Sequence, residues 1–133
     1  MKVLALDYGS ARTGVAVSDP TGTVARPLGV VERAGSDAGL ARIAELVVEH
    51  EAERVVVGLP LTMLGHHGEQ AVETERFVSR LRETLGVPVE SFDERFTTAL
   101  ARQAGQTRAA EDAVAAAHLL TSYLQWKASA RLA

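Results

Sequence analysis

Cysteine is absent from this 133-residue sequence, and aromatic residues make up only 5% of it. Without cysteine, the chain can form no disulfide bond, no thiol nucleophile and no zinc site built on thiolates. Long apolar runs are also missing, since none comes near the roughly 18 residues that a helix needs to cross a bilayer. With no membrane span and no recognisable targeting segment, we expect the protein to work in the cytoplasm.

The overall composition is that of a folded domain. Hydrophobic residues account for 47% of the chain and charged residues for 23%, which is typical of globular proteins. The length is sufficient for one hydrophobic core and too short for two. Because no internal repeat or linker interrupts the sequence, we expect a single domain over residues 1–133.

The charge balance leaves a nucleic-acid partner open. A formal net charge of −3 argues against such a partner, but the local field governs the binding of polyanions. Two bound divalent cations would add four positive charges and bring the total of −3 to +1. Arginine, which matches phosphate oxygens better than lysine does, supplies twelve of the fourteen basic residues.

The first third of the chain is typical of an antiparallel meander. Three apolar segments predict strands over Lys2–Asp7, Thr13–Ser18 and Leu28–Glu32. The first two are separated by the turn-forming residues 8–11, and the second and third by the turn that begins at residues 19–22.

Helices and strands alternate in the rest of the chain. The predicted elements are a helix capped by Ser36 or Asp37, a strand over Arg54–Leu59, a helix over Glu69–Leu85, a strand over Val87–Phe92, a short helix over Thr97–Ala104 and a last helix over Arg108–Lys127. A meander followed by such alternation predicts an α/β fold, with a five-stranded mixed sheet covered by helices on both faces.

Asp7 is the first candidate for a functional carboxylate. It ends a strand whose residues are apolar on both faces, so this strand should lie in the centre of the sheet. Sites in open α/β sheets collect beyond the carboxyl ends of such strands. Asp7 is equally suited to initiate the turn before Gly9, and the residues alone leave both roles open.

Glu94 follows the last predicted strand. If that strand is parallel to the first and close to it, Glu94 reaches the same edge of the sheet as Asp7. By itself, however, the triplet Asp93-Glu94-Arg95 is typical of a solvated loop, and Asp93 or Thr97 can cap the short helix. Only its position in the chain favours a functional role for Glu94.

Asp112 is the most informative of the three carboxylates. It shares one face of the last helix with residues expected to be buried, namely Ala116, Leu119, Leu120 and Tyr123. A carboxylate on a buried face needs a partner or a cation. Asp112 could instead favour the helix dipole from the first turn, although Glu111 can do so on the solvated side.

Carboxylates contributed by separate elements suit hard cations. Mg²⁺ takes oxygen ligands and is usually held by one or two carboxylates together with substrate phosphate. Two such ions can activate water and stabilise the leaving oxygen in phosphodiester cleavage. The three acids therefore predict a site for Mg²⁺ or Mn²⁺, with two ions.

Four stretches of the sequence resemble the YqgF family, also called RuvX, of Holliday-junction-resolvase-like and pre-16S rRNA nucleases. They are Leu4–Gly9 with Arg12–Ala16, Val57–Pro60, Phe92–Thr98 and Glu111–Ala116. The resemblance implies an RNase H-like fold and makes Asp7, Glu94 and Asp112 the catalytic and metal-binding carboxylates. It also implies processing of the 5′ end of pre-16S rRNA during ribosome biogenesis.

Two segments depart from the family's pattern. After Pro60 the family usually has an asparagine and a polar loop, whereas this chain has residues 61–68 with His66 and His67, which we expect to be solvated. The stretch before Asp112 is often rich in lysine, and here it offers only Arg108. Other residues can therefore bind the substrate, and the candidates are Tyr8, Arg12, Arg95 and Arg108. Arg95 can equally pair with Asp93.

Several functions compete at this point. The first is a metal-dependent endonuclease that hydrolyses RNA or DNA, acting as a monomer or homodimer. A resolvase of Holliday junctions or other branched DNA is the first alternative, and a non-catalytic adaptor that binds nucleic acid or RNA polymerase is another. Phosphoryl transfer is a third, because residues 7–14 also resemble a phosphate loop of actin-like and sugar-kinase ATPases. Those proteins close two domains around a nucleotide, and 133 residues supply one.

Overall fold

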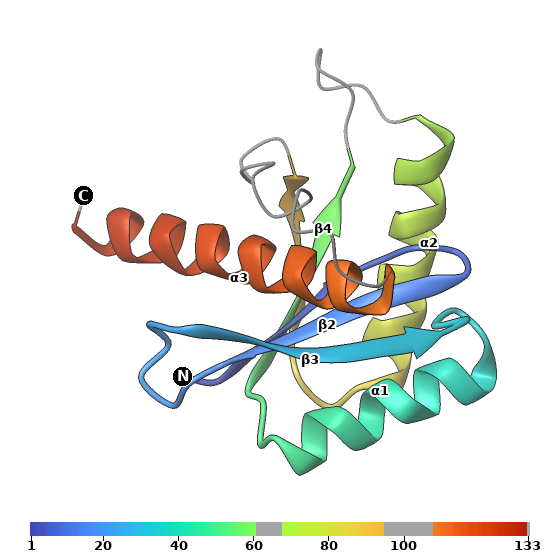
Figure 1. Ribbon diagram of the computed structural model, residues 1–133, viewed down its shortest axis with the longest axis horizontal. Coiled ribbons are helices and arrows are strands. Elements are labelled where there is room, and N and C mark those ends of the chain that lie inside the picture. The colour runs from blue at the N-terminus through green and yellow to red at the C-terminus, as the bar shows by residue number, and fades with distance from the viewer. Residues whose placement is uncertain (61–67, 95–107, 133) are drawn as a thin grey trace.

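Five strands form one mixed sheet in the order β3-β2-β1-β4-β5 (Figure 1). The computed structural model describes residues 1–60, 68–94 and 108–132. The strands are β1 (Val3–Asp7), β2 (Arg12–Ser18), β3 (Ala25–Glu32), β4 (Arg54–Leu59) and β5 (Val89–Asp93). Pairing is antiparallel between β1, β2 and β3, and parallel between β1, β4 and β5. This confirms the predicted meander, the parallel strands after it and the central place of the first strand.

Two strands begin more than one residue away from the predicted position. β3 begins at Ala25 and not at Leu28, although it then contains Pro27. Proline lacks the N–H that a central strand must donate, but β3 lies at the edge of the sheet, where this is tolerated. β5 begins at Val89 because Pro88 precedes it as a connection, and the Pro88 carbonyl accepts a hydrogen bond from the Val55 N–H at 2.9 Å.

Helices α1 (Asp37–Glu49) and α2 (Glu69–Thr84) cover one face of the sheet. Ser36 caps α1, as predicted, because its hydroxyl accepts a hydrogen bond from the Gly39 N–H at 3.0 Å. The core on this face consists of strand residues that alternate along β1, β2 and β4 and of the apolar sides of both helices, including Leu4, Leu6, Val15, Val57, Ile43, Phe77 and Leu81.

The long helix α3 (Arg108–Leu132) crosses the other face of the sheet (Figure 1). Its buried residues include Ala116, Leu119, Leu120 and Tyr123, so the predicted buried face is confirmed. The helix continues to Leu132, past the predicted end at Lys127. Along the part of the chain that the structure describes, no helix has the length and apolar character needed to cross a membrane.

A polar cluster anchors α3 to the sheet through Glu90 of β5. Its Oε1 atom accepts hydrogen bonds from the Tyr123 hydroxyl at 2.7 Å and from Arg54 Nη1 at 2.9 Å, and Lys127 Nζ lies 3.9 Å away. Burial acts to raise the pKa of Glu90, but these hydrogen bonds and the nearby cations prevail, and the pKa is lowered. The Glu90 carboxylate is therefore held ionised between the helix and the sheet.

Candidate active site

The alternation of side chains along β1 directs Asp7 towards α3. Leu4 and Leu6 belong to the core beneath α1 and α2, whereas Val3 and Ala5 pack in the core beneath α3. Successive residues of a strand point to opposite faces, so Asp7 follows Ala5. It ends the central strand and is partly buried. Asp7 is thus placed on the α3 face at the carboxyl edge of the sheet.

Glycines flank Asp7 on both neighbouring strands. Gly14 of β2 is its direct partner in the antiparallel register. On the other side Leu6 pairs with Val57, so the next residue of β4, Gly58, lies beside Asp7. The alternation of each strand directs both of these positions towards α3. Because neither position carries a side chain, other groups can approach the backbone closely on both sides of Asp7.

The backbone of α3 occupies the space above Gly14. A β-carbon on Gly14 would stand 1.9 Å from the carbonyl oxygen of Asp112 and 2.4 Å from its carbonyl carbon. Only glycine allows the helix to rest so closely on β2. The contact brings the start of α3, and with it Asp112, to one side of Asp7.

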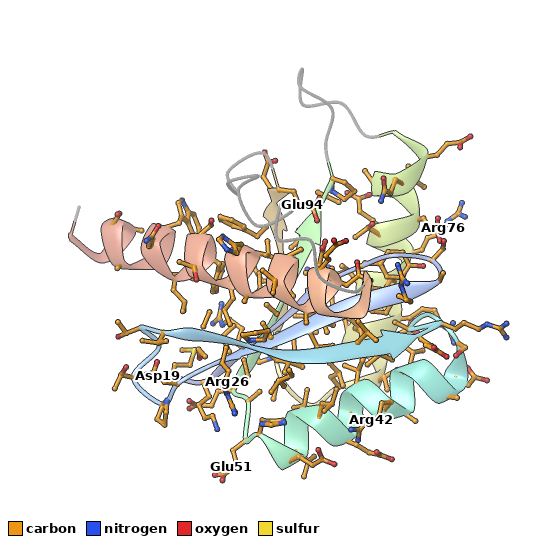
Figure 2. The ribbon with its side chains drawn as sticks, viewed as in Figure 1. Asp19, Arg26, Arg42, Glu51, Arg76 and Glu94 are labelled. Atoms are coloured by element: carbon orange, nitrogen blue, oxygen red, sulfur yellow. The ribbon has the colours of Figure 1, made fainter. Side chains whose placement is uncertain are left out.

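The side chain of Glu94 occupies the space above Gly58. A β-carbon there would stand 2.5 Å from Glu94 Oε1 and 2.9 Å from its Cγ. Figure 2 shows Glu94 at the end of β4, where the parallel strands finish. The structure therefore places the backbone of Asp112 over the glycine on one side of Asp7 and the side chain of Glu94 over the glycine on the other.

Asp112 forms an ion pair with Arg12, the first residue of β2. Arg12 Nε lies 3.0 Å from Asp112 Oδ2, and the two side chains are 34% and 32% exposed. Both contacting atoms are buried, and neither has an aligned hydrogen bond with any residue that the structure describes, so the contact is one of charge at close range. Arg12 was expected to contact substrate, and the structure places it against a candidate metal ligand.

The donor set suits a hard cation in its chemistry. All three side chains offer carboxylate oxygens, and Asp112 Oδ2 is a buried oxygen without an aligned donor. Among the residues that the structure describes, no three acidic or histidine side chains stand close enough to hold an ion as they are. The carboxylates fit the ion by type and by placement on one edge, and binding would require their side chains to close in.

Tyr8 is not brought together with the three carboxylates. Its ring stacks on Phe77 of α2 with the ring centroids 4.4 Å apart, and its hydroxyl donates to Glu73 Oε1 at 2.9 Å. Burial, and then the hydrogen bond to Glu73, raise the pKa of Tyr8 to about 12. The contacts with Phe77 and Glu73 place Tyr8 on the α2 side of the sheet.

Other predicted features fall outside the described residues. These are Arg95, His66, His67 and the short helix over Thr97–Ala104. Arg108 begins α3, but its side chain is also outside the described part.

Sequence reasoning missed Gly14 and Gly58 as parts of the site. Both lie inside predicted strands, in Thr13-Gly14-Val15 and Val57-Gly58-Leu59. A glycine inside a strand weakens it unless another group approaches the backbone closely. That signal was available in the sequence, but it does not reveal which group approaches.

Comparison with protein families and curated proteins places the chain among nucleases. The model of the RuvX family, described as Holliday junction resolvase, matches residues 1–126. A protein of Chloroflexus aggregans is 43% identical over 130 residues, covering 92% of each chain. One from Syntrophomonas wolfei is 37% identical over 132 residues, covering 93% of this chain and 94% of its own. Both carry the provisional name of pre-16S rRNA nuclease.

Solved structures with the same fold include two resolvases. RuvC of Thermus thermophilus, in complex with a Holliday junction substrate, has a TM-score of 0.62 at 20% identity and covers 97% of this chain and 96% of its own. Fowlpox virus resolvase, in complex with Holliday junction DNA, has a TM-score of 0.59 at 10% identity, with 96% and 99% covered. At these identities the likeness concerns the fold, which is RNase H-like as the family resemblance implied.

Proposed function

This chain belongs to the RuvX family, and we propose that it is a metal-dependent endonuclease that processes the 5′ end of pre-16S rRNA. Nuclease activity is supported by the family and by the names of its relatives. The observation that carries the proposal is the arrangement around Asp7, where Asp112 and Glu94 lie over Gly14 and Gly58 at one edge of the sheet.

Asp7, Glu94 and Asp112 would together hold Mg²⁺ or Mn²⁺, with two ions as our proposal. Such ions, when bound, supply the Lewis acidity that activates a water and stabilises a leaving oxygen in phosphodiester hydrolysis. Asp7 is fixed by the central strand and gives the site its centre. The carboxylate of Glu94 lies over the backbone of Gly58, and there it would orient a water by accepting a hydrogen bond from it.

Nucleic acid is the proposed partner. Arg95 and Arg108 adjoin the site in sequence, and we retain both as contacts for the substrate phosphates, together with the outer nitrogens of Arg12. The proposal does not use Tyr8, because it lies on the opposite side of the sheet. An rRNA precursor as substrate implies action in the cytoplasm, where ribosomes are assembled.

Branched DNA is the second candidate substrate. The family description and the two resolvase structures, both solved with a Holliday junction, favour it, while the names of the relatives that are 43% and 37% identical favour an rRNA precursor. The same carboxylates would serve either substrate, because hydrolysis of the phosphodiester is the same reaction.

One parallel assay tests both candidates. The purified protein is incubated with an RNA that spans the 5′ boundary of 16S rRNA and with a Holliday junction, each in Mg²⁺, Mn²⁺ and excess chelator. We expect metal-dependent cleavage of the RNA, lost by orders of magnitude in Glu94→Gln and retained in Glu83→Gln, which changes an exposed glutamate of α2.

The same assay contains the outcomes that contradict the proposal. Cleavage that persists in chelator would exclude a metal-dependent reaction. Cleavage of the junction alone would make the protein a resolvase. Tight binding of RNA without cleavage in either metal would instead support an adaptor that binds nucleic acid.

A further inference from the structure

Arg12 and Asp112 meet although they come from different layers of the fold. Arg12 begins β2, and Asp112 lies near the start of α3, which rests on β2 at Gly14, two residues after Arg12. Both side chains therefore start from backbones that are held together. The 3.0 Å separation of Arg12 Nε and Asp112 Oδ2 follows from the packing of helix on strand and does not depend on a chance meeting of two mobile side chains.

The two oxygens of Asp112 lie in different surroundings. Oδ2 faces Arg12 and is buried, whereas the side chain as a whole is 32% exposed. Because Oδ2 is buried, the exposure of the side chain comes from its other atoms, which include Oδ1. With Oδ2 engaged by Arg12, Oδ1 is the oxygen that a ligand would use.

We infer that Arg12 is a positioning residue, which holds Oδ2 of Asp112 so that Oδ1 points to the proposed metal site. This inference rests on the proposed function, because it assigns Asp112 to the metal. A partner behind a metal ligand fixes the ligand's orientation, and its loss typically weakens metal binding by about 10- to 100-fold. Arg12 also places a positive charge beside Asp112, which would offset part of the repulsion among the three carboxylates when they close in on a metal.

A direct contact with substrate phosphate is the competing role for Arg12. Nε is turned to Asp112, but the guanidinium has two further nitrogens that can bind a phosphate oxygen. The two roles differ in one measurable respect. A positioning residue changes the affinity for metal without substrate, whereas a phosphate contact changes the affinity for RNA without metal.

The experiment is a calorimetric titration of Mn²⁺ into the Arg12→Gln variant in the absence of nucleic acid. We expect its dissociation constant for Mn²⁺ to rise about 10- to 100-fold above wild type. Binding of RNA in chelator should stay within twofold of wild type. Arg42→Gln is the matched control, because Arg42 forms ion pairs with Glu45 and Glu49 on the exposed side of α1, far from Glu94 (Figure 2). It should leave both affinities unchanged.

Two further variants make the result specific to the pair. Arg12→Lys keeps the charge and should recover part of the affinity for Mn²⁺. In an Asp112→Asn background, Arg12→Gln should have little additional effect, since its target is gone. Thermal unfolding in chelator shows whether each variant is folded before it is titrated, and Arg12→Lys serves as the test variant if Arg12→Gln is not.

Three outcomes would overturn the inference. Unchanged Mn²⁺ affinity with weaker RNA binding would assign Arg12 to the phosphate. Unchanged values for both would make the pair an ordinary surface contact. If the wild-type protein does not bind Mn²⁺, the proposed function itself is wrong. This outcome differs from the first two, because in both of those the wild type binds Mn²⁺.

Discussion

The carboxylate of Glu94 lies directly over the backbone of Gly58, in the space that a β-carbon would fill. Glu94 comes from the segment after β5 and Gly58 from the adjacent strand, one residue beyond the pair of Leu6 and Val57. The position that a glycine leaves empty is thus where a candidate catalytic group enters the neighbourhood of Asp7.

Gly58→Ala should abolish most cleavage while preserving the fold. The new methyl group would stand 2.5 Å from Glu94 Oε1, and the end of this flexible side chain can move away with little strain elsewhere. A displaced carboxylate can no longer share the site with Asp7, and a displacement of about 1 Å can lower the rate about 100-fold. Single-turnover cleavage and thermal unfolding, measured side by side, check this prediction.

Gly68→Ala provides the control for Gly58→Ala, since a β-carbon on Gly68 would meet no atom of the described residues within 4 Å. It should cleave at the wild-type rate. If Gly58→Ala does the same, the observed place of Glu94 does not matter for catalysis.

Gly14→Ala should damage both stability and activity. Its methyl group would lie 1.9 Å from the carbonyl oxygen of Asp112, which is backbone and cannot rotate aside. Helix α3 must then move off the sheet, and overpacking of this kind costs about 1–3 kcal/mol in the free energy of unfolding. Urea denaturation measures the loss.

Gly86→Ala is the comparison for Gly14→Ala, because no atom in the described part of the chain lies within 4 Å of a β-carbon at that position. Equal stability of the two variants would mean that the close packing of α3 on β2 does not contribute to stability.

Tyr123→Phe should lower stability in a way that depends on pH. The hydroxyl of Tyr123 is buried and donates to Glu90 at 2.7 Å, and a hydrogen bond to a charged group contributes about 1.5–3 kcal/mol. Because the folded pKa of Glu90 is lowered from 4.5, the stability that it contributes is present above pH 4.5 and is lost as the pH falls through the folded value. The difference in the free energy of unfolding between wild type and Tyr123→Phe should therefore become smaller as the pH falls below 4.5.

Tyr8→Phe is the matched variant at the other tyrosine, whose hydroxyl donates to an exposed glutamate, Glu73. It should cost less at every pH. If both variants lose the same stability, and the loss does not change between pH 3 and pH 7, the buried hydrogen bond to Glu90 stabilises the fold no more than the exposed one to Glu73.

Much of the fold could be predicted because local patterns and global packing agree. The apolar residues of β1 on both faces indicated a central strand, and this placed Asp7 at the edge where the parallel strands end. The spacing of Asp112, Ala116 and Tyr123 likewise identified the side of α3 that meets the sheet. These inferences depend on periodicity, which short stretches of sequence carry by themselves.

Contacts between distant segments could not be predicted in the same way. Arg12 and Asp112 are far apart in the sequence, and their ion pair depends on how closely α3 packs against Gly14. No local sequence pattern predicts that distance. The extension of β3 through Pro27 depends on its place at the edge of the sheet, a property of the whole topology. Both required the three-dimensional arrangement.

The central claim is that Asp7, between the two glycines, is the middle ligand of a catalytic metal site. The most direct measurement is the single-turnover rate at which Asp7→Asn cleaves an RNA spanning the 5′ boundary of 16S rRNA in Mg²⁺, relative to wild type. The amide keeps the size of the side chain and removes its charge, so we predict a rate lower by about 100-fold or more in a protein that unfolds at a similar temperature. A folded Asp7→Asn variant that cleaves at the wild-type rate would contradict the account.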